Sequence, residues 1–176
     1  MKTSLLTMVA LALPAFAQTS VPEALAKHWK ISGEFTIAVA DAMPAETYSF
    51  RPNPEQMSYG QLMAHIAGVN LNACANASGL ARPPLPPKIA AWAKDTQKVE
   101  VDKPTALRFL SDTFDFCNQA VAAMTPSRMD SVAGPPARNL TGFEWLWAYF
   151  THTAHHRGQA EVYLRVRGIK PPEYRF

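Results

Sequence analysis

The sequence has little of what marks nucleic-acid-binding and membrane-spanning proteins. Its 17 Lys and Arg residues are set against 14 Asp and Glu, which leaves a net charge of only +3, and the basic residues are scattered. A nucleic-acid-binding face needs concentrated positive charge, so we expect no nucleic-acid partner. A membrane-spanning helix needs about 18 or more consecutive apolar residues. The chain has no such run, and we expect no membrane span.

The one marked apolar stretch is at the N-terminus and has the features of a secretory signal peptide. Lys2 supplies a short basic region, Leu5 to Leu13 is apolar, and Ala15-Phe16-Ala17 forms a small-x-small cleavage site. The apolar stretch is too short to cross a bilayer. We therefore expect cleavage near Ala17 and export to the periplasm or secretion. The mature chain, residues 18–176, has the size of a single domain.

Cysteine is scarce, since the chain contains only Cys74 and Cys117. Export makes a disulfide feasible. Both cysteines lie on apolar stripes of predicted helices, so we expect them to approach each other. The sequence cannot place their Cβ atoms within bonding reach. A disulfide and two buried thiols therefore stay equally open at this stage.

Several catalytic signatures are absent as well. The chain has no G-x-S-x-G elbow, no phosphate-binding loop and no dinucleotide-binding fingerprint. Thr153 follows His152, so the HExxH motif of zincin proteases is missing too. These absences disfavour the common serine hydrolases, nucleotide-binding enzymes and zincins.

Helical periodicity dominates the chain, and we find no alternating strand pattern and no internal repeat. Capping boxes at Ser58 and Thr141 mark helix starts, and Gly79 and Gly168 mark helix ends. A proline-rich connection over residues 80–102 separates the second and third helices. The predicted fold is all-α, a four-helix bundle with one long crossover. Its predicted helices cover residues 21–43, 58–78, 102–124 and 141–168.

The histidines form the most informative pattern. His152 and His156 lie one helical turn apart and only about 40° apart around the helix axis, so both can face one ion. His155 is rotated about 60° the other way. A divalent ion needs a further ligand, and His65 is the only other histidine in mid-helix on an apolar face. Taken alone, His65 is typical of a hydrogen-bonded core histidine, and His28 has no ligand-like spacing. Three neutral imidazoles with an open fourth position are typical of a catalytic metal site.

Residues around the last histidines are candidates for supporting roles. A ligating imidazole usually donates its second N–H to a nearby oxygen. Gln159 and Glu161 are candidates for that oxygen, and Arg157 for binding an acidic group or an anionic substrate. The alternative for each is a helix-surface residue with i, i+4 contacts. Glycine within a helix costs about 1 kcal/mol, and we expect Gly158 to mark a close helix approach.

The segment from His152 to Pro172 resembles the C-terminal signature of the DinB family of bacterial four-helix proteins. The segment 51–70, with Met57-Ser58-Tyr59-Gly60-Gln61-Leu62-Met63-Ala64-His65-Ile66-Ala67, resembles that family's second-helix motif. The resemblance implies a bundle of unusual connectivity and pairing as homodimers. It also implies a divalent metal, zinc or nickel, bound by His65, His152 and His156. Family members with known activities include thiol S-transferases and a thiol-dependent isomerase.

Three functional hypotheses follow. The leading one is a metal-dependent enzyme that performs hydrolysis or thiol/group transfer on a small molecule. The second is a non-catalytic protein of the cell envelope that binds a metal or a small ligand. The third is a purely structural metal site, or none, with the histidines as core residues.

Overall fold

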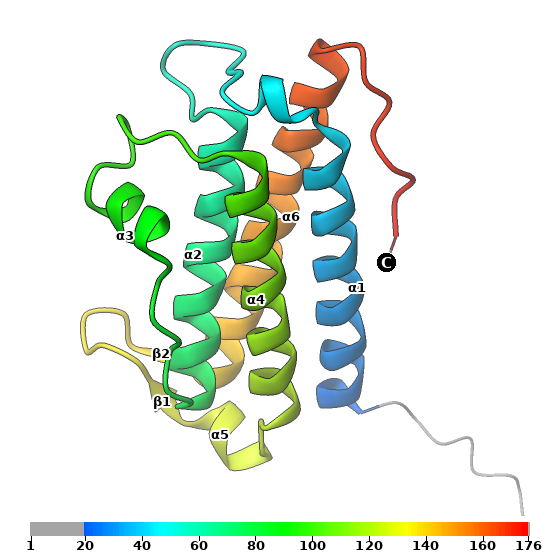
Figure 1. Cartoon of the computed structure of the whole chain (residues 1–176). Helices are drawn as coiled ribbons and strands as arrows, with labels where there is room; N and C mark the ends of the chain where they lie inside the picture. The colour runs from blue at the N-terminus through cyan, green and yellow to red at the C-terminus, as the bar shows by residue number, and fades with distance from the viewer. Residues whose placement is uncertain (1–19, 176) are drawn as a thin grey trace, which may run out of the picture.

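The computed structural model describes residues 20–175, and four long helices dominate it (Figure 1). The expected signal-peptide cleavage site near Ala17 lies outside the described residues. The long helices are α1 (Val21–Ala42), α2 (Tyr59–Ser78), α4 (Lys103–Ala122) and α6 (Gly142–Val166). The shorter elements are η1 (Ala45–Thr47), α3 (Pro87–Lys94), α5 (Pro126–Asp130), β1 (Val132–Ala133) and β2 (Leu140–Thr141).

The long helices form a bundle in which α1 and α6 run in one direction, and α2 and α4 in the other (Figure 1). The main packing partners of α2 are α4 and α6, and α1 packs against the same two helices. α1 and α2 therefore occupy opposite corners of the bundle. The crossover between α2 and α4 makes these two helices parallel. The predicted all-α bundle with one long crossover is confirmed.

Two local features differ from the expectation. The proline-rich connection over residues 80–102 contains an eight-residue helix, α3, in which Pro87 takes the first position, where its missing N–H costs no hydrogen bond. The two-residue strands β1 and β2 form a small antiparallel hairpin, with Val132 opposite Thr141. Strands this short carry no readable alternation, which is why the sequence pattern did not indicate them.

Reciprocal caps explain where three of the long helices begin. In each capping box, the side-chain hydroxyl of the first residue accepts a hydrogen bond from the backbone N–H three residues later. The side chain of that later residue accepts one in return. Two of these boxes were predicted, and the third, at Ser20, was not. The residue pairs are Ser20 with Glu23, Ser58 with Gln61, and Thr141 with Glu144.

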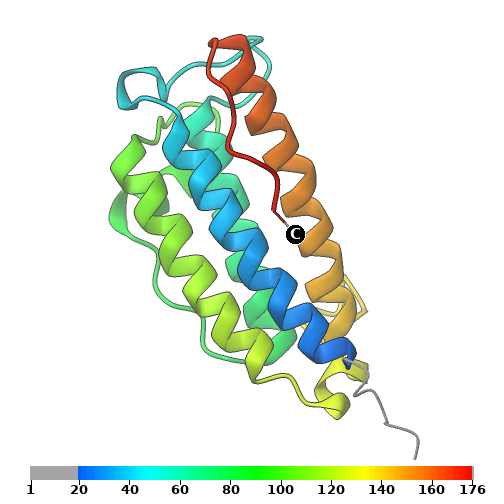
Figure 2. The same cartoon turned by 90° about the vertical axis from the view of Figure 1, so that its right-hand side faces the viewer.

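The core lies between the four helices, and the C-terminal segment covers one of its seams. Trp29, Leu110 and Leu146 are at most 1% exposed. Residues 167–175 turn back and run along the seam between α1 and α6 (Figure 2). There the ring of Tyr174 meets Phe35 edge-on, with ring centroids 5.6 Å apart. Among the described residues, no helix is both long and apolar enough to cross a membrane.

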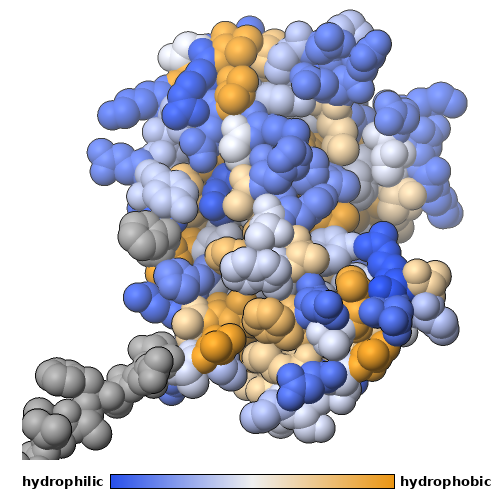
Figure 3. All heavy atoms as spheres, turned by 180° about the vertical axis from the view of Figure 1, so that it is seen from behind, coloured by the Kyte–Doolittle hydropathy of each residue, from blue (hydrophilic) through white to orange (hydrophobic). Residues whose placement is uncertain are grey.

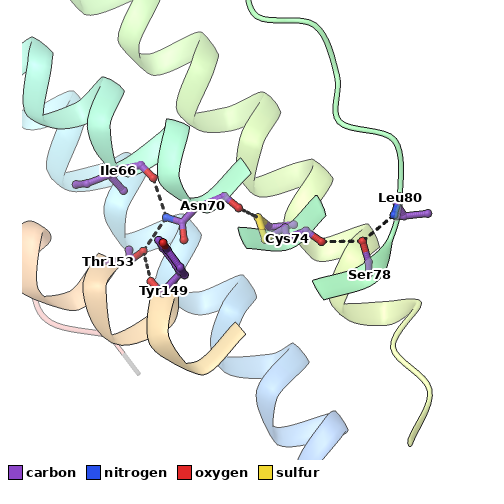
Figure 4. Close-up of a disulfide and its surroundings, with 8 residues drawn as sticks. Ile66, Asn70, Cys74, Ser78, Leu80, Tyr149 and Thr153 are labelled. Atoms are coloured by element: carbon purple, nitrogen blue, oxygen red, sulfur yellow. Dashed lines mark hydrogen bonds between the residues drawn. A yellow bond between two sulfur atoms is a disulfide. The ribbon is translucent and has the colours of Figure 1, made fainter. Parts of the chain in front are cut away.

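A disulfide joins α2 to α4. Cys74 and Cys117 are fully buried, their Cα atoms are 5.3 Å apart, and their sulfur atoms are bonded (Figure 4). The expected approach of the two cysteines is therefore observed, and the open question between bridge and thiols is answered in favour of the bridge.

Gly158 does not mark a close helix approach, contrary to expectation. It lies on the exposed side of α6, and a Cβ added there would meet no atom within 4 Å. The glycines in close contact are elsewhere. At Gly60 in α2, an added Cβ would lie 1.8 Å from the carbonyl oxygen of Val101.

Gly158→Ala is therefore expected to stabilise the protein. The change adds helical propensity without a clash and should raise the free energy of unfolding by about 0.5–1 kcal/mol. Chemical denaturation measures this difference. Gly60→Ala is the matched control, because it makes the same chemical change in a helix but forces Val101 aside, and it should destabilise. A Gly158→Ala protein no more stable than wild type would contradict this account.

Candidate metal centre

Three histidines from two neighbouring helices meet at one point of the bundle. His65 comes from α2, and His152 and His156 come from α6. The ring centroid of His65 lies 5.2 Å from that of His152 and 4.7 Å from that of His156. Each of the three histidines offers one ring nitrogen as a potential ligand, and these three nitrogens lie within 4.8 Å of one another. The cluster is thus compatible with a bound divalent ion.

The two histidines of α6 have the spacing of two ligands of one ion. Their Nε2 atoms are 3.1 Å apart. Two nitrogens at bond lengths of about 2.0–2.1 Å lie roughly 2.9 Å apart at a right angle and roughly 3.4 Å apart at the tetrahedral angle. The observed separation falls between these values.

Gln159 sets the protonation of His156. Its Oε1 lies 2.7 Å from Nδ1 of His156 and can only accept, so Nδ1 carries the hydrogen. The Nε2 atom of His156 then presents a lone pair toward His152. The amide nitrogen of Gln159 lies 3.1 Å from Nε2 of His155 and donates to it. Gln159 thus has the geometry expected of a group that orients a ligating imidazole.

Gln159→Ala is expected to weaken metal binding by about 10- to 100-fold, the usual cost of losing such an orienting partner. Competition titration with a metal-chelating dye measures the affinity. Glu161→Ala is the control, because Glu161 lies on the same helix and its carboxylate contacts Arg165 at 3.5 Å. Equal affinities of the two variants would show that Gln159 has no orienting role.

The other two supporting candidates do not lie at the cluster. Arg157 is buried against α1, where it donates to the carbonyl oxygen and hydroxyl of Ser32, and its guanidinium lies 4.6 Å from the ring centroid of Phe35. One residue along a helix is a rotation of about 100°, so Arg157 and His156 face different neighbours. Glu161 pairs with Arg165. The expectation that Arg157 binds an anionic substrate is corrected, because its side chain stabilises the contact between α1 and α6.

Burial keeps the clustered imidazoles neutral. It lowers the pKa of His65 to about 4, with the neighbouring His156 and His152 adding to the effect. Burial likewise lowers the pKa of His152 to about 4, assisted by His156 and His155. The pKa of His156 is also lowered, chiefly by burial. Neutral imidazole is the form that binds a metal, so these residues suit a divalent ion even in mildly acidic solution.

The metal-free protein is expected to lose stability as the pH falls from about 6.5 to about 4. Histidine in the unfolded chain titrates near 6.5, whereas His65 and His152 in the folded protein titrate near 4. Between these values the unfolded state binds more protons, so acid favours unfolding. The stability that the two neutral histidines contribute is fully present above their unfolded pKa of about 6.5. It is lost as the pH falls to their folded pKa of about 4.

Denaturant unfolding at pH 7.5, 6 and 4.5 measures this loss. A His65→Gln/His152→Gln double variant lacks both titrating groups and should show a shallower decline than wild type. The carboxylates are common to both proteins and cancel in the comparison. Identical declines would contradict the lowered pKa values.

Two hollows adjoin His65. One, of about 370 Å³, lies beneath α3 and is lined by His65, Asn72, Arg82 and Trp92, among others. The other, of about 410 Å³, is lined by His65, Val69, Arg138, Leu140, Ala148, Tyr149 and His152. Both are large enough for a small molecule. A third hollow, between α1 and α6, is lined by His28 and by none of the clustered histidines.

Asn70 and Thr153 position the site, and sequence reasoning missed both (Figure 4). The buried amide of Asn70 donates to the carbonyl oxygen of Ile66 and, at 2.7 Å, to Oγ1 of Thr153. Thr153 in turn donates to the carbonyl oxygen of Tyr149. This chain of hydrogen bonds fixes α2 against α6 close to the histidines. The available signal was an asparagine four residues after Ile66 and four before Cys74, at the spacing of the buried face of α2.

Comparisons with known proteins identify the family. The model of the DinB superfamily matches residues 29–160. No curated protein matches the chain significantly. A DinB-like protein from Bacillus cereus ATCC 10987 has a similar structure, with a TM-score of 0.70 and 19% sequence identity, covering 87% of this chain and 97% of that one. A DinB-like protein from Bacillus subtilis is similar with a TM-score of 0.66 and 18% identity, covering 86% and 96%. These structures share the fold, and because the family model matches most of the sequence, the chain belongs to the DinB superfamily.

Proposed function

We propose that this protein is a metal-dependent enzyme that performs hydrolysis or thiol/group transfer on a small molecule. His65, His152 and His156 would hold the ion, zinc or nickel. The observation that carries this proposal is the convergence of three imidazoles, with lowered pKa values, beside two hollows that can admit a ligand.

The bound ion and the residues around the histidine cluster would have different roles. A bound zinc or nickel ion would supply Lewis acidity and lower the pKa of a water or thiol. Gln159 holds His156 in the tautomer whose Nε2 can ligate. Tyr149 and Arg138 line the hollow beside His65 and His152 and can bind a substrate there. Leu140 and Ala148 give the same hollow an apolar part.

Metal analysis and an activity screen test this proposal. Protein purified without a histidine tag is loaded with zinc or nickel and assayed against small esters, amides and electrophiles with low-molecular-weight thiols. We expect about one ion per chain, and turnover that depends on the ion and is lost in His156→Ala. Turnover that is equal in wild type and His156→Ala would rule out the three-histidine site as its origin.

A non-catalytic protein of the cell envelope that binds a metal or a small ligand is the second candidate. One observation favours it: among the described residues, no carboxylate lines either hollow beside His65, so the site has no acidic general base. Stoichiometric metal binding without turnover in the full screen would support this candidate over the enzyme.

We also propose that the protein is exported, as the N-terminal sequence predicts. The disulfide between Cys74 and Cys117 supports this, because disulfides persist in oxidising compartments and are rare in the cytosol. Cell fractionation followed by mass spectrometry tests it. We expect a periplasmic or secreted chain that begins at Gln18, and an intact Met1 in the cytosol would contradict export.

We further propose that the protein pairs as a homodimer. Hydrophobic side chains gather on the lower part of the rear face (Figure 3). Near the starts of α1 and α6, Val21 is 62% and Trp147 53% exposed beside Phe143 and Phe150, and exposed apolar clusters are typical of interaction surfaces. Sedimentation should give a dimer for wild type and a monomer for Trp147→Glu. A monomeric wild type would contradict the pairing.

A further inference from the structure

The hairpin formed by β1 and β2 brings one arginine to the hollow beside the histidines. Arg138 lies in the loop between the strands, and its side chain lines the hollow together with His65, His152 and Tyr149. Its guanidinium donates a hydrogen bond to the hydroxyl of Tyr149 and lies 5.7 Å from the ring centroid of Trp145. Two aromatic side chains of α6 therefore hold Arg138 in place.

The hairpin itself is firmly built. The indole N–H of Trp145 donates to the carbonyl oxygen of Ala133 at 2.8 Å, and the N–H of Arg138 donates to the carbonyl oxygen of Pro135 at 3.0 Å. Asn139, the next residue, has a φ of 34°, in the left-handed region that few non-glycine residues adopt. Asparagine adopts this region several-fold more often than most other residues, so Asn139 suits this position of the turn.

The charge of Arg138 is not neutralised by the protein. Among the described residues, no carboxylate forms an ion pair with Arg138. No acidic residue lines this hollow either. Its neighbours on the histidine side are neutral imidazoles, so the hollow carries net positive charge with or without an ion at the cluster.

The hydrogen bonds leave donors for a ligand. Tyr149 accepts from Arg138 through its phenol oxygen, so its own hydrogen is available for a second acceptor. Arg138 has five N–H donors, and its bond to Tyr149 uses one of them. A guanidinium with free N–H donors can bind two oxygen atoms of one carboxylate or phosphate group through two parallel hydrogen bonds.

We propose that Arg138 and Tyr149 form an anion-binding subsite, and that the ligand is a small molecule bearing a carboxylate or phosphate group. Arg138 and Tyr149 hold this group, and the rest of the ligand extends toward His65 and His152. The inference deepens the proposed function by naming the class of substrate. The subsite itself rests on the protein's own side chains and needs no metal.

Calorimetric titration of the full mature protein tests the subsite, with benzoate and inorganic phosphate as the anions and benzamide as the neutral analogue of benzoate. Each is titrated into metal-free and zinc-loaded protein. We expect at least one anion to bind both forms, about tenfold or more weakly after Arg138→Gln and a few-fold more weakly after Tyr149→Phe. The preferred anion tells a carboxylate ligand from a phosphate one.

Arg108→Gln is the matched control, since Arg108 is an exposed arginine of α4 that pairs with Asp112, and its variant should bind the anion as wild type does. Unchanged anion binding in Arg138→Gln, equal binding of benzamide and benzoate, or no anion binding at all would overturn the subsite. Zinc analysis of the same samples keeps the two proposals separate. Wild type that binds benzoate through Arg138 but retains no zinc would contradict the metal centre and support the subsite.

Discussion

Replacing His156 by alanine is expected to remove most of the bound metal. His156 presents a lone pair on Nε2, 3.1 Å from the same atom of His152, and Gln159 holds it in that tautomer. Without it only two imidazoles remain, one from each helix, and a divalent ion is under-coordinated. Removing an orienting partner alone costs about 10- to 100-fold in affinity, so removing the ligand should cost more than about 100-fold. Metal analysis after dialysis measures the loss.

His155→Ala is the matched control for that experiment. His155 is the neighbouring residue on the same helix, so the two variants differ only in which face of α6 loses an imidazole. The amide nitrogen of Gln159 donates to His155, and the loss of His155 leaves intact the hydrogen bond that Nδ1 of His156 donates to Oε1 of Gln159. We expect His155→Ala to keep nearly all its metal. If both variants lost metal equally, the assignment of ligands by helix face would be wrong.

The bundle could be predicted because its signals are local. Capping boxes at Ser58 and Thr141 and the glycines after α2 and α6 fix helix ends within a few residues. The spacing of His152 and His156 fixes their shared face in the same way. Each of these inferences depends on residues within one or two helical turns.

Features that depend on contacts between distant segments could not be predicted from such signals. Arg157 lies next to His156 in sequence, but whether it faces the cluster or α1 depends on how α6 is rotated in the bundle. Arg138 follows two prolines in an unpatterned loop, and only the hairpin brings it to His152. The free space around Gly158 could not be predicted either, because it depends on which face of α6 has no neighbouring helix.

Removing the disulfide is expected to destabilise the protein by about 4 kcal/mol. The two cysteines are separated by 43 residues, and closing a loop of that length restricts the unfolded chain by about this amount in the chain-entropy model. The loop spans the last five residues of α2, the whole crossover and most of α4, so the bridge holds together two helices that no short turn connects. For a domain of this size, a loss of 4 kcal/mol lowers the melting temperature by roughly 10 °C.

Thermal unfolding of wild type and of a Cys74→Ala/Cys117→Ala variant, each with and without a reductant, measures this effect. The reductant should lower the melting temperature of wild type toward that of the variant and leave the variant unchanged. Because the cysteines are fully buried, reduction of the folded protein will be slow, and the samples must be reduced while unfolded and then refolded. The variant separates the bridge from other effects of the reductant, since it contains no sulfhydryl group. A count of two free thiols in the unreduced protein, or equal melting temperatures with and without reductant, would show that the bridge does not stabilise the bundle.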